Sequence, residues 1–212
     1  MDQHLEKSSH EKQQFFDRHA ADWDKERGEK EEHLRALVKD MGLNPSDTVI
    51  EPGCGTGLFS SVLLEYLGEK GKLYGVDISR QMLEQAEAKE LGPRAFFYHA
   101  DAAHMPFSAA FADAVVCFRA FPHYDDRPGA LAEFSRVLKA GGLLVIAHLA
   151  GREQLNEFHA TAGGEVATDM LPDESGMRRL LSAAGFDLIS VEDREGRYLL
   201  RAGKSRQLDT GK

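Results

Sequence analysis

Apolar and polar positions along the middle of the chain follow two periods in turn, one typical of strands and one of helices. Short continuous apolar runs predict five strands, at residues 48–50, 72–77, 95–99, 112–118 and 143–149. Apolar residues at three- and four-residue steps predict the helices between them, at residues 58–67, 79–91 and 128–138. Fully apolar strands separated by helices are typical of a parallel sheet that is covered on both faces.

Further elements are predicted on either side of this stretch. A short amphipathic helix near the N-terminus is indicated by five periodic residues: Phe15, Phe16, His19, Ala20 and Trp23. This helix either packs on the core or forms a lid over a ligand. The other elements are helices at residues 29–41, 152–160 and 173–184, and strands at residues 186–191 and 198–201.

These elements predict one domain over residues 1–202, because 212 residues with 42% hydrophobic content suit a single core. Its parts are an N-terminal helical cap (1–46), a ligand-binding core (47–149), a second cap with a helix (150–185) and C-terminal strands (186–202). The last ten residues, 203–212, are polar, and we expect them to be disordered.

The charge of the chain limits the classes of partner. The formal net charge is −9, which disfavours binding to nucleic acid or to a membrane surface, since both are anionic. The N-terminal residues 1–12 are polar and do not resemble a secretory signal, and no apolar run is long enough to span a membrane. The two cysteines, Cys54 and Cys117, are too few for a disulfide framework. We therefore expect a cytoplasmic protein, either a monomer or a homodimer.

The strongest local motif is the glycine-rich segment 51–57, Glu-Pro-Gly-Cys-Gly-Thr-Gly, which follows a predicted strand and opens a helix. Glycines there allow a sharp turn and close approach of the backbone to a ligand. The next strand ends at Asp77, 20 residues after Gly57. A carboxylate at that point can accept hydrogen bonds from ribose hydroxyls.

The identity of the adenosine-containing ligand depends on two further residues. A dinucleotide motif would carry glycine at the sixth position of the loop, where this chain has Leu58. Glu51 precedes the loop, and a carboxylate there suits a cationic ligand better than a pyrophosphate. S-adenosylmethionine (SAM) carries both an ammonium and a sulfonium group. A solvated Glu51 at a strand end is the alternative interpretation.

Five segments in order are similar to motifs of the class I SAM-dependent methyltransferases, in the branch of the ubiquinone and menaquinone methyltransferases. They are residues 51–57, 75–86, 100–107, 111–118 and 133–142, preceded by residues 16–24, which resemble the cofactor-capping helix of that family. The resemblance weakens after His148, in the region that recognises the substrate in such enzymes.

The resemblance implies a Rossmann-like, doubly wound α/β fold. Its seven-stranded sheet would be mostly parallel with helices on both faces, and its last strand, near residues 198–201, would be antiparallel. It implies SAM as cofactor, S-adenosylhomocysteine (SAH) as product and in-line methyl transfer. The implied cofactor-binding residues are Trp23, Glu51, Gly53, Cys54, Gly55, Gly57, Asp77, Ile78, Met82, Asp101, Ala102 and Phe118.

The methyl acceptor should lie beyond the carboxyl ends of the fourth and fifth strands. Candidate substrate-binding residues there are Arg119, His123, Tyr124, His148 and His159. His123 and His148 are also candidate catalytic bases. No metal is expected, because the spacing of the three histidines is not that of a compact metal motif.

Three functions remain open. The first is methyl transfer to a small molecule, with RNA or protein as a less favoured acceptor because the chain is acidic and has no added basic domain. The second is a non-catalytic SAM- or SAH-binding module that acts through partners. The third is a nicotinamide-dependent oxidoreductase, against which Glu51 and Leu58 argue.

Overall fold

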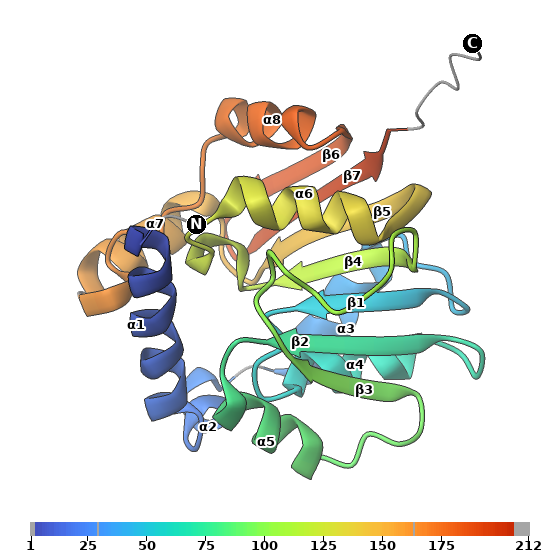
Figure 1. Cartoon of the computed structure of the whole chain (residues 1–212), viewed down its shortest axis with the longest axis horizontal. Coiled ribbons are helices and arrows are strands. Elements are labelled where there is room, and N and C mark those ends of the chain that lie inside the picture. Colours follow the sequence, from blue (N-terminus) through green and yellow to red (C-terminus); the bar gives the residue numbers. More distant parts are fainter. Residues whose placement is uncertain (1–2, 29, 163, 206–212) are drawn as a thin grey trace.

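A seven-stranded sheet forms the centre of the computed structural model, which describes residues 3–28, 30–162 and 164–205 (Figure 1). In spatial order the strands are β3 (Ala95–His99), β2 (Lys72–Asp77), β1 (Thr48–Pro52), β4 (Ala112–Phe118), β5 (Leu138–His148), β7 (Arg197–Lys204) and β6 (Phe186–Arg194). β7 pairs antiparallel with both β5 and β6. The other neighbouring pairs, β3 with β2, β2 with β1, β1 with β4 and β4 with β5, are parallel. This confirms the predicted doubly wound sheet with an antiparallel last strand.

Helices cover both faces of the sheet. On one face, α3 (Glu31–Asp40) and α4 (Leu58–Tyr66) share a buried cluster with the strands. On the other face, α6 (Arg127–Val137) and α8 (Glu174–Ala183) do the same. α5 (Arg80–Ala88) packs beside β2 and β3.

Alternation along the strands explains why both faces are apolar. In β1, Val49 faces the cluster of α3 and α4, whereas Ile50 faces that of α6 and α8, and both are fully buried. In β5, Val145 and Ile146 divide in the same way. A strand that is buried on both sides needs apolar residues at every position, which produces the continuous runs seen in the sequence.

The junction between α6 and β5 differs from the prediction. The helix ends at Val137, and β5 already begins at Leu138, which pairs with Ala112. The next pair, Ala114 with Leu143, leaves residues 139–142 as a bulge. Glycine suits both of its last positions, because Gly141 has a φ of +73° and a side chain at Gly142 would approach the carbonyl oxygens of Lys139 and Asp113 within 2.9 and 3.1 Å.

The two chain ends also differ from the prediction. Instead of one short helix, the N-terminal segment forms α1 (Gln3–His19) and, after a turn, α2 (Trp23–Arg27). At the other end, Gly203 and Lys204 belong to β7, because their backbones pair with β5 and β6. The expected disorder at 203 and 204 is therefore wrong, and residues 206–212 lie outside the described part of the chain.

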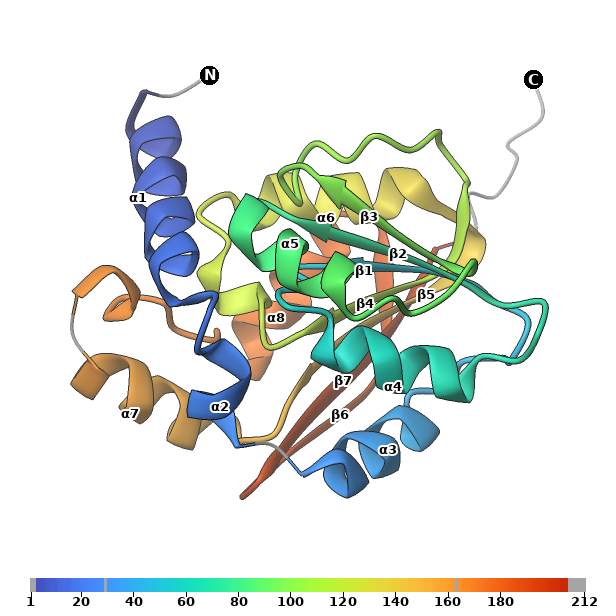
Figure 2. The same ribbon diagram turned by 90° about the horizontal axis from the view of Figure 1, so that it is seen from below.

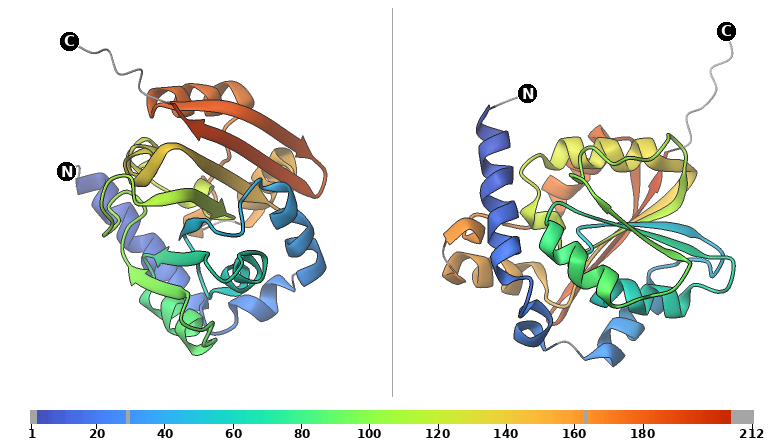
Figure 3. Two further views of the ribbon diagram at one scale, coloured as in Figure 1. Left: turned by 90° about the vertical axis from the view of Figure 1, so that its right-hand side faces the viewer. Right: turned by 60° about the horizontal axis from the view of Figure 1, so that its bottom comes forward.

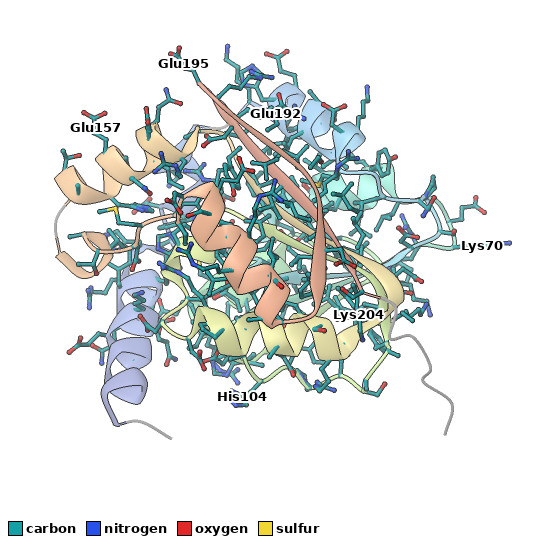
Figure 4. The ribbon with its side chains drawn as sticks, turned by 90° about the horizontal axis from the view of Figure 1, so that it is seen from above. Lys70, His104, Glu157, Glu192, Glu195 and Lys204 are labelled. Carbon is teal, nitrogen blue, oxygen red and sulfur yellow. The ribbon has the colours of Figure 1, made fainter. Side chains whose placement is uncertain are left out.

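Helices α1 and α2 lie across one end of the sheet, beside α7 (Arg152–Ala162) and α5 (Figures 2 and 3). α1 also contacts the short helix η2 (Gly164–Val166) that follows α7. Charged side chains such as Lys70, Glu157 and Glu195 point away from the body of the molecule (Figure 4). None of the helices in the described residues is long and apolar enough to cross a membrane.

The packing of α6 generates a stability prediction. Phe134 is fully buried and its ring meets Tyr124 edge-on, with centroids 6.1 Å apart. Phe134→Ala should lower the free energy of unfolding by about 3 to 4 kcal/mol, because it leaves a cavity in the core. Phe158→Ala is the matched control, since Phe158 is 55% exposed, and it should cost less than about 1 kcal/mol. Denaturant unfolding measures both, and equal losses would contradict the described packing.

Candidate active site

A cavity of about 430 Å³ lies at the carboxyl ends of β1, β2 and β4, beneath α1 and α2. In doubly wound sheets, this end of the strands, where the strand order reverses, is the usual place for a ligand. Here the reversal falls between β1 and β4, since β2 lies on the other side of β1. The topology therefore places the glycine loop and the residues after β4 in the same cavity.

The glycine loop is shaped by close backbone contacts. The backbone N–H groups of Gly53 and Cys54 donate to the carbonyl oxygen of Val76, at 2.7 and 3.1 Å. Gly53 has a φ of +73°, and a side chain there would meet the Ala120 methyl group at 2.4 Å. Only glycine fits this position, and its use keeps the loop next to the segment that follows β4.

Asp77 holds the other side of the loop. Its carboxylate accepts hydrogen bonds from the backbone N–H of Gly55 at 2.7 Å and of Ser79 at 2.9 Å. Burial raises its pKa to about 6, although these two hydrogen bonds oppose the shift. Asp77 lines the cavity, so one carboxylate both orders the loop and faces the space available to a ligand.

Glu51 is a buried carboxyl in the cavity wall and not a solvated residue. It is 1% exposed, and its Oε2 accepts a hydrogen bond from the Ser60 hydroxyl. Burial raises the pKa of Glu51 to about 8, and the nearby Asp77 adds to the shift. A cationic ligand would oppose both effects, which makes this end of the cavity selective for positive charge.

The remaining cofactor candidates divide into two groups. Trp23, Cys54, Ile78, Met82, Asp101, Ala102 and Phe118 line the cavity with the residues already described. Gly57 does not. A side chain at Gly57 would meet Ala86 of α5 at 3.0 Å, so this glycine permits close packing of α4 against α5. The structure thus shows a packing role for Gly57, and its contact with a ligand stays a prediction.

The helical cap is joined to the glycine-loop end of the cavity by polar anchors that the sequence did not reveal. Asp17 of α1 accepts a hydrogen bond from the Ser79 hydroxyl. In α2, Asp24 accepts one from Thr56 of the glycine loop and forms an ion pair with Lys89 at 2.9 Å. Because each anchor pairs the cap with a residue of the loop or at one end of α5, the cap and the glycine loop are structurally coupled.

The residues after β4 form the opposite wall. Arg119 adopts a φ of +56°, its N–H donates to the Ala147 carbonyl, and it lines the cavity. The Tyr124 hydroxyl donates to the carbonyl of Pro52 at 2.9 Å, and Tyr124 also lines the cavity. Tyr124 therefore ties this wall to the strand that carries the glycine loop. His123 completes this group of cavity-lining candidates.

The other two histidine candidates lie outside the cavity lining. His148 is 1% exposed, and neither of its ring nitrogens has a hydrogen-bond partner in the described residues. Burial holds its pKa well below the usual range, so the ring is neutral. His159 is 4% exposed, and its Nδ1 bonds to the carbonyl oxygen of Asp169. The expectation that both contact the substrate is not supported by these positions, because their rings are enclosed by protein.

Two residues near His123 were not predicted from the sequence. Asp169 bonds to His123, and Lys12 bonds to Asp169, at 2.7 and 2.8 Å. Lys12 lies in a helix rich in charge and Asp169 in an irregular segment, so neither had a pattern that distinguished it from surface residues. Only the packing of α1 against the segment after η2 brings them together.

Sequence comparison identifies relatives of the core. Residues 50–146 match the family of methyltransferase domains. An O-methyltransferase of Penicillium expansum is 30% identical over 166 residues, which cover 74% of this chain and 59% of that protein. A demethylmenaquinone methyltransferase of Staphylococcus aureus is 32% identical over 112 residues, which cover 52% and 46% respectively. The chain thus spans about half the length of the curated relatives that it matches.

Solved structures share the whole fold. A Haloferax volcanii chain in complex with the Trm112 methyltransferase activator has a TM-score of 0.75 at 21% identity, over 90% of this chain and 98% of that one. The magnesium protoporphyrin IX methyltransferase of Synechocystis, solved with bound SAH, has a TM-score of 0.70 at 19% identity, over 93% and 100%. At such identities the likeness is one of fold.

Together, the fold and the cavity are those of the class I SAM-dependent methyltransferases. Within this chain, residues 50–146, which carry the glycine loop and Asp77, match the family of methyltransferase domains. SAM is the cofactor of this class, and the cavity fits it on two counts. Glu51 and Asp77 provide buried carboxyls suited to a cationic ligand with a ribose. The glycine loop has open space at Gly55, so a ligand can approach the backbone of the loop closely.

Gly53→Ala tests the close approach in the loop. The methyl group would overlap with Ala120 and strain a positive φ, so SAM affinity should fall by about 10-fold or more. Gly92→Ala is the matched control, because Gly92 has a φ of +88° with open space around it. It should cost about 1 kcal/mol of stability without changing affinity. Calorimetric titration and denaturant unfolding separate the two effects, and unchanged SAM affinity in Gly53→Ala would refute the contact.

Glu51→Gln tests the raised pKa. Since the folded-state pKa of about 8 lies above the usual 4.5, the stabilising contribution is complete below pH 4.5 and is lost as pH rises through 8. The ligand-free variant should therefore gain stability relative to the wild type as pH rises across this window, by on the order of 3 kcal/mol.

Denaturant unfolding at pH 5 and pH 8.5 measures this difference. Glu87→Gln, at an exposed position of α5, controls for the loss of a charge. If the stability difference between Glu51→Gln and the wild type were the same at pH 5 and at pH 8.5, as is expected for Glu87→Gln, the raised pKa of Glu51 would be contradicted.

Proposed function

We propose that this protein transfers a methyl group from SAM to a small-molecule acceptor by in-line displacement. The supporting observation is that one cavity contains both the cofactor cradle and a second group of polar side chains. The cradle is formed by the glycine loop with Glu51 and Asp77. The second group, the acceptor wall, comprises Arg119, His123 and Tyr124. A site with both parts suits a reaction between two ligands better than the storage of one.

The protein's contribution to such a reaction is mainly positional. When bound, SAM supplies a methyl group that is already electrophilic because it is attached to a sulfonium. The chain's residues have to orient the acceptor and exclude water. Phe16 and Trp23 of the cap, with ring centroids 5.6 Å apart, line the cavity together with Phe118. These apolar rings suit the exclusion of water.

Several observations favour a small molecule as the acceptor. The cavity volume of about 430 Å³ is typical of small-molecule sites. The matched relatives are named as an O-methyltransferase and a demethylmenaquinone methyltransferase. The net charge of −9 disfavours nucleic acid. Cys54 and Cys117 are buried free thiols, which suits a reducing cytoplasm, and we propose that location.

The alternative is a non-catalytic SAM- or SAH-binding module. The similar Haloferax volcanii chain was solved in complex with an activator, which shows that this fold can work with a protein partner. A binding module would keep the cofactor cradle but would not need an acceptor wall. Turnover therefore distinguishes the two functions, whereas cofactor affinity does not.

The test of this proposal is methyl transfer from labelled SAM to a cell extract divided into small metabolites and macromolecules. We expect label in the small-metabolite fraction. Asp77→Asn should weaken SAM binding by about 10-fold or more and lower the labelling in parallel. Asp187→Asn, at an exposed position of β6, is the control and should behave like the wild type. Label confined to macromolecules, or no label at all, would contradict the proposed function.

A further inference from the structure

His123 and Asp169 form a hydrogen-bonded pair beside the acceptor wall. The Nδ1 of His123 lies 2.7 Å from Oδ2 of Asp169, although the two residues are 46 positions apart in the sequence. Their side chains are 14% and 4% exposed, respectively. An ionised carboxylate only accepts hydrogen bonds, so the Nδ1 of His123 must be the donor. The pair therefore fixes which nitrogen of the ring carries the proton.

Asp169 is itself held in place on two sides. Its Oδ1 accepts a hydrogen bond from Lys12 at 2.8 Å, and Lys12 also pairs with Asp125 at 2.7 Å. The backbone carbonyl oxygen of Asp169 accepts a hydrogen bond from Nδ1 of His159. Burial alone would raise the pKa of Asp169, but the hydrogen bonds from His123 and Lys12 outweigh it and hold the pKa below its usual range. The partner of His123 is thus an oriented carboxylate.

The ring of His123 lines the cavity and packs edge-on against Phe16, with centroids 5.4 Å apart. Because Nδ1 is engaged by Asp169, Nε2 on the other edge of the ring is left with a lone pair. No hydrogen bond to Nε2 is found among the described residues. Burial lowers the pKa of His123 by more than Asp169 raises it, so the ring is neutral at physiological pH.

From this geometry we propose that His123 is the general base of methyl transfer, with Asp169 and Lys12 as positioning residues, and that the acceptor presents an ionisable hydroxyl group. The inference rests on the proposed function and specifies its acceptor. A neutral base inside the cavity serves an acceptor that has to lose a proton in order to react. A hydroxyl meets this condition, because its oxygen is a weak nucleophile until its proton is removed.

Atoms and electrons balance in this step. The hydroxyl oxygen forms a bond to the methyl carbon while the carbon–sulfur bond breaks, and that electron pair returns to sulfur to give neutral SAH. The hydroxyl proton passes to Nε2 of His123. The resulting imidazolium is stabilised by the Asp169 carboxylate, as in other histidine–aspartate pairs, and the proton then leaves to solvent.

The first experiment reads the tautomer of His123 in the full chain labelled with ¹⁵N-histidine, with the His123→Gln variant used to assign its signals. At pH 7.5 the wild type should show a neutral ring protonated at Nδ1, and Asp169→Asn should abolish this preference. A ring protonated at Nε2, or an imidazolium, would overturn the proposal whatever the acceptor. The other charged or titratable groups that act on His123 are Lys12, His148, His159 and Asp169, so the signals of His148 and His159 are read in the same spectra.

The second experiment measures methyl transfer to the small-metabolite fraction and identifies the labelled products by mass spectrometry. His123→Gln should lower the rate by roughly 100-fold or more while SAM affinity is retained. Asp169→Asn should lower it less, and Asp169→Glu should restore part of the rate. His33→Gln, at an exposed position of α3, is the matched control with wild-type activity. The labelled products should be methyl ethers.

The outcomes separate the two claims. An active wild type with an equally active His123→Gln variant would contradict the base and leave the proposed function intact. Labelled products that carry the methyl group on sulfur or on a quaternary nitrogen would contradict the hydroxyl acceptor. A wild type that binds SAM but labels no small molecule would contradict the proposed function itself.

Discussion

Burial of two carboxyl groups at the ends of β1 and β2 constrains the rest of the site. Glu51 and Asp77 are 1% and 8% exposed, and burial raises the pKa of both. Placing ionisable carboxyls in such an environment costs stability, which hydrogen bonds from Ser60, Gly55 and Ser79 offset in part. A cationic ligand offsets the remainder, so the same arrangement that weakens the empty fold favours the cofactor.

The helical cap serves both as packing and as part of the site. Its residue Phe16 lines the cavity, and its anchors Asp17 and Asp24 reach the start of α5 and the glycine loop. On the acceptor side, Lys12 of the same helix as Phe16 and Asp17 forms ion pairs with Asp125 and Asp169. Because the cap contacts both the cofactor cradle and the acceptor wall, a structural change in one of these two parts can affect the other.

The sequence was sufficient to predict the sheet, since β1, β2, β4 and β5 are largely buried on both faces and this burial imposes continuous apolar runs. It also predicted the loop and Asp77, because a tight turn at a strand end requires glycine and the topology brings the end of the neighbouring strand beside that turn. It did not reveal the packing of Gly57 against α5, which depends on the distance to Ala86. It failed as well for the pairing of His123 with Asp169, which depends on how segments without any periodic pattern fold over the cavity.

Glu51, which burial holds largely protonated in the empty cavity, should become ionised when a cation binds beside it. Calorimetric titration with SAM at pH 7, in two buffers of different ionisation enthalpy, counts the protons exchanged on binding. We expect the wild type to release up to about one proton on binding SAM and Glu51→Gln to release less. A binding enthalpy that does not depend on the buffer, or the same release from both proteins, would contradict it.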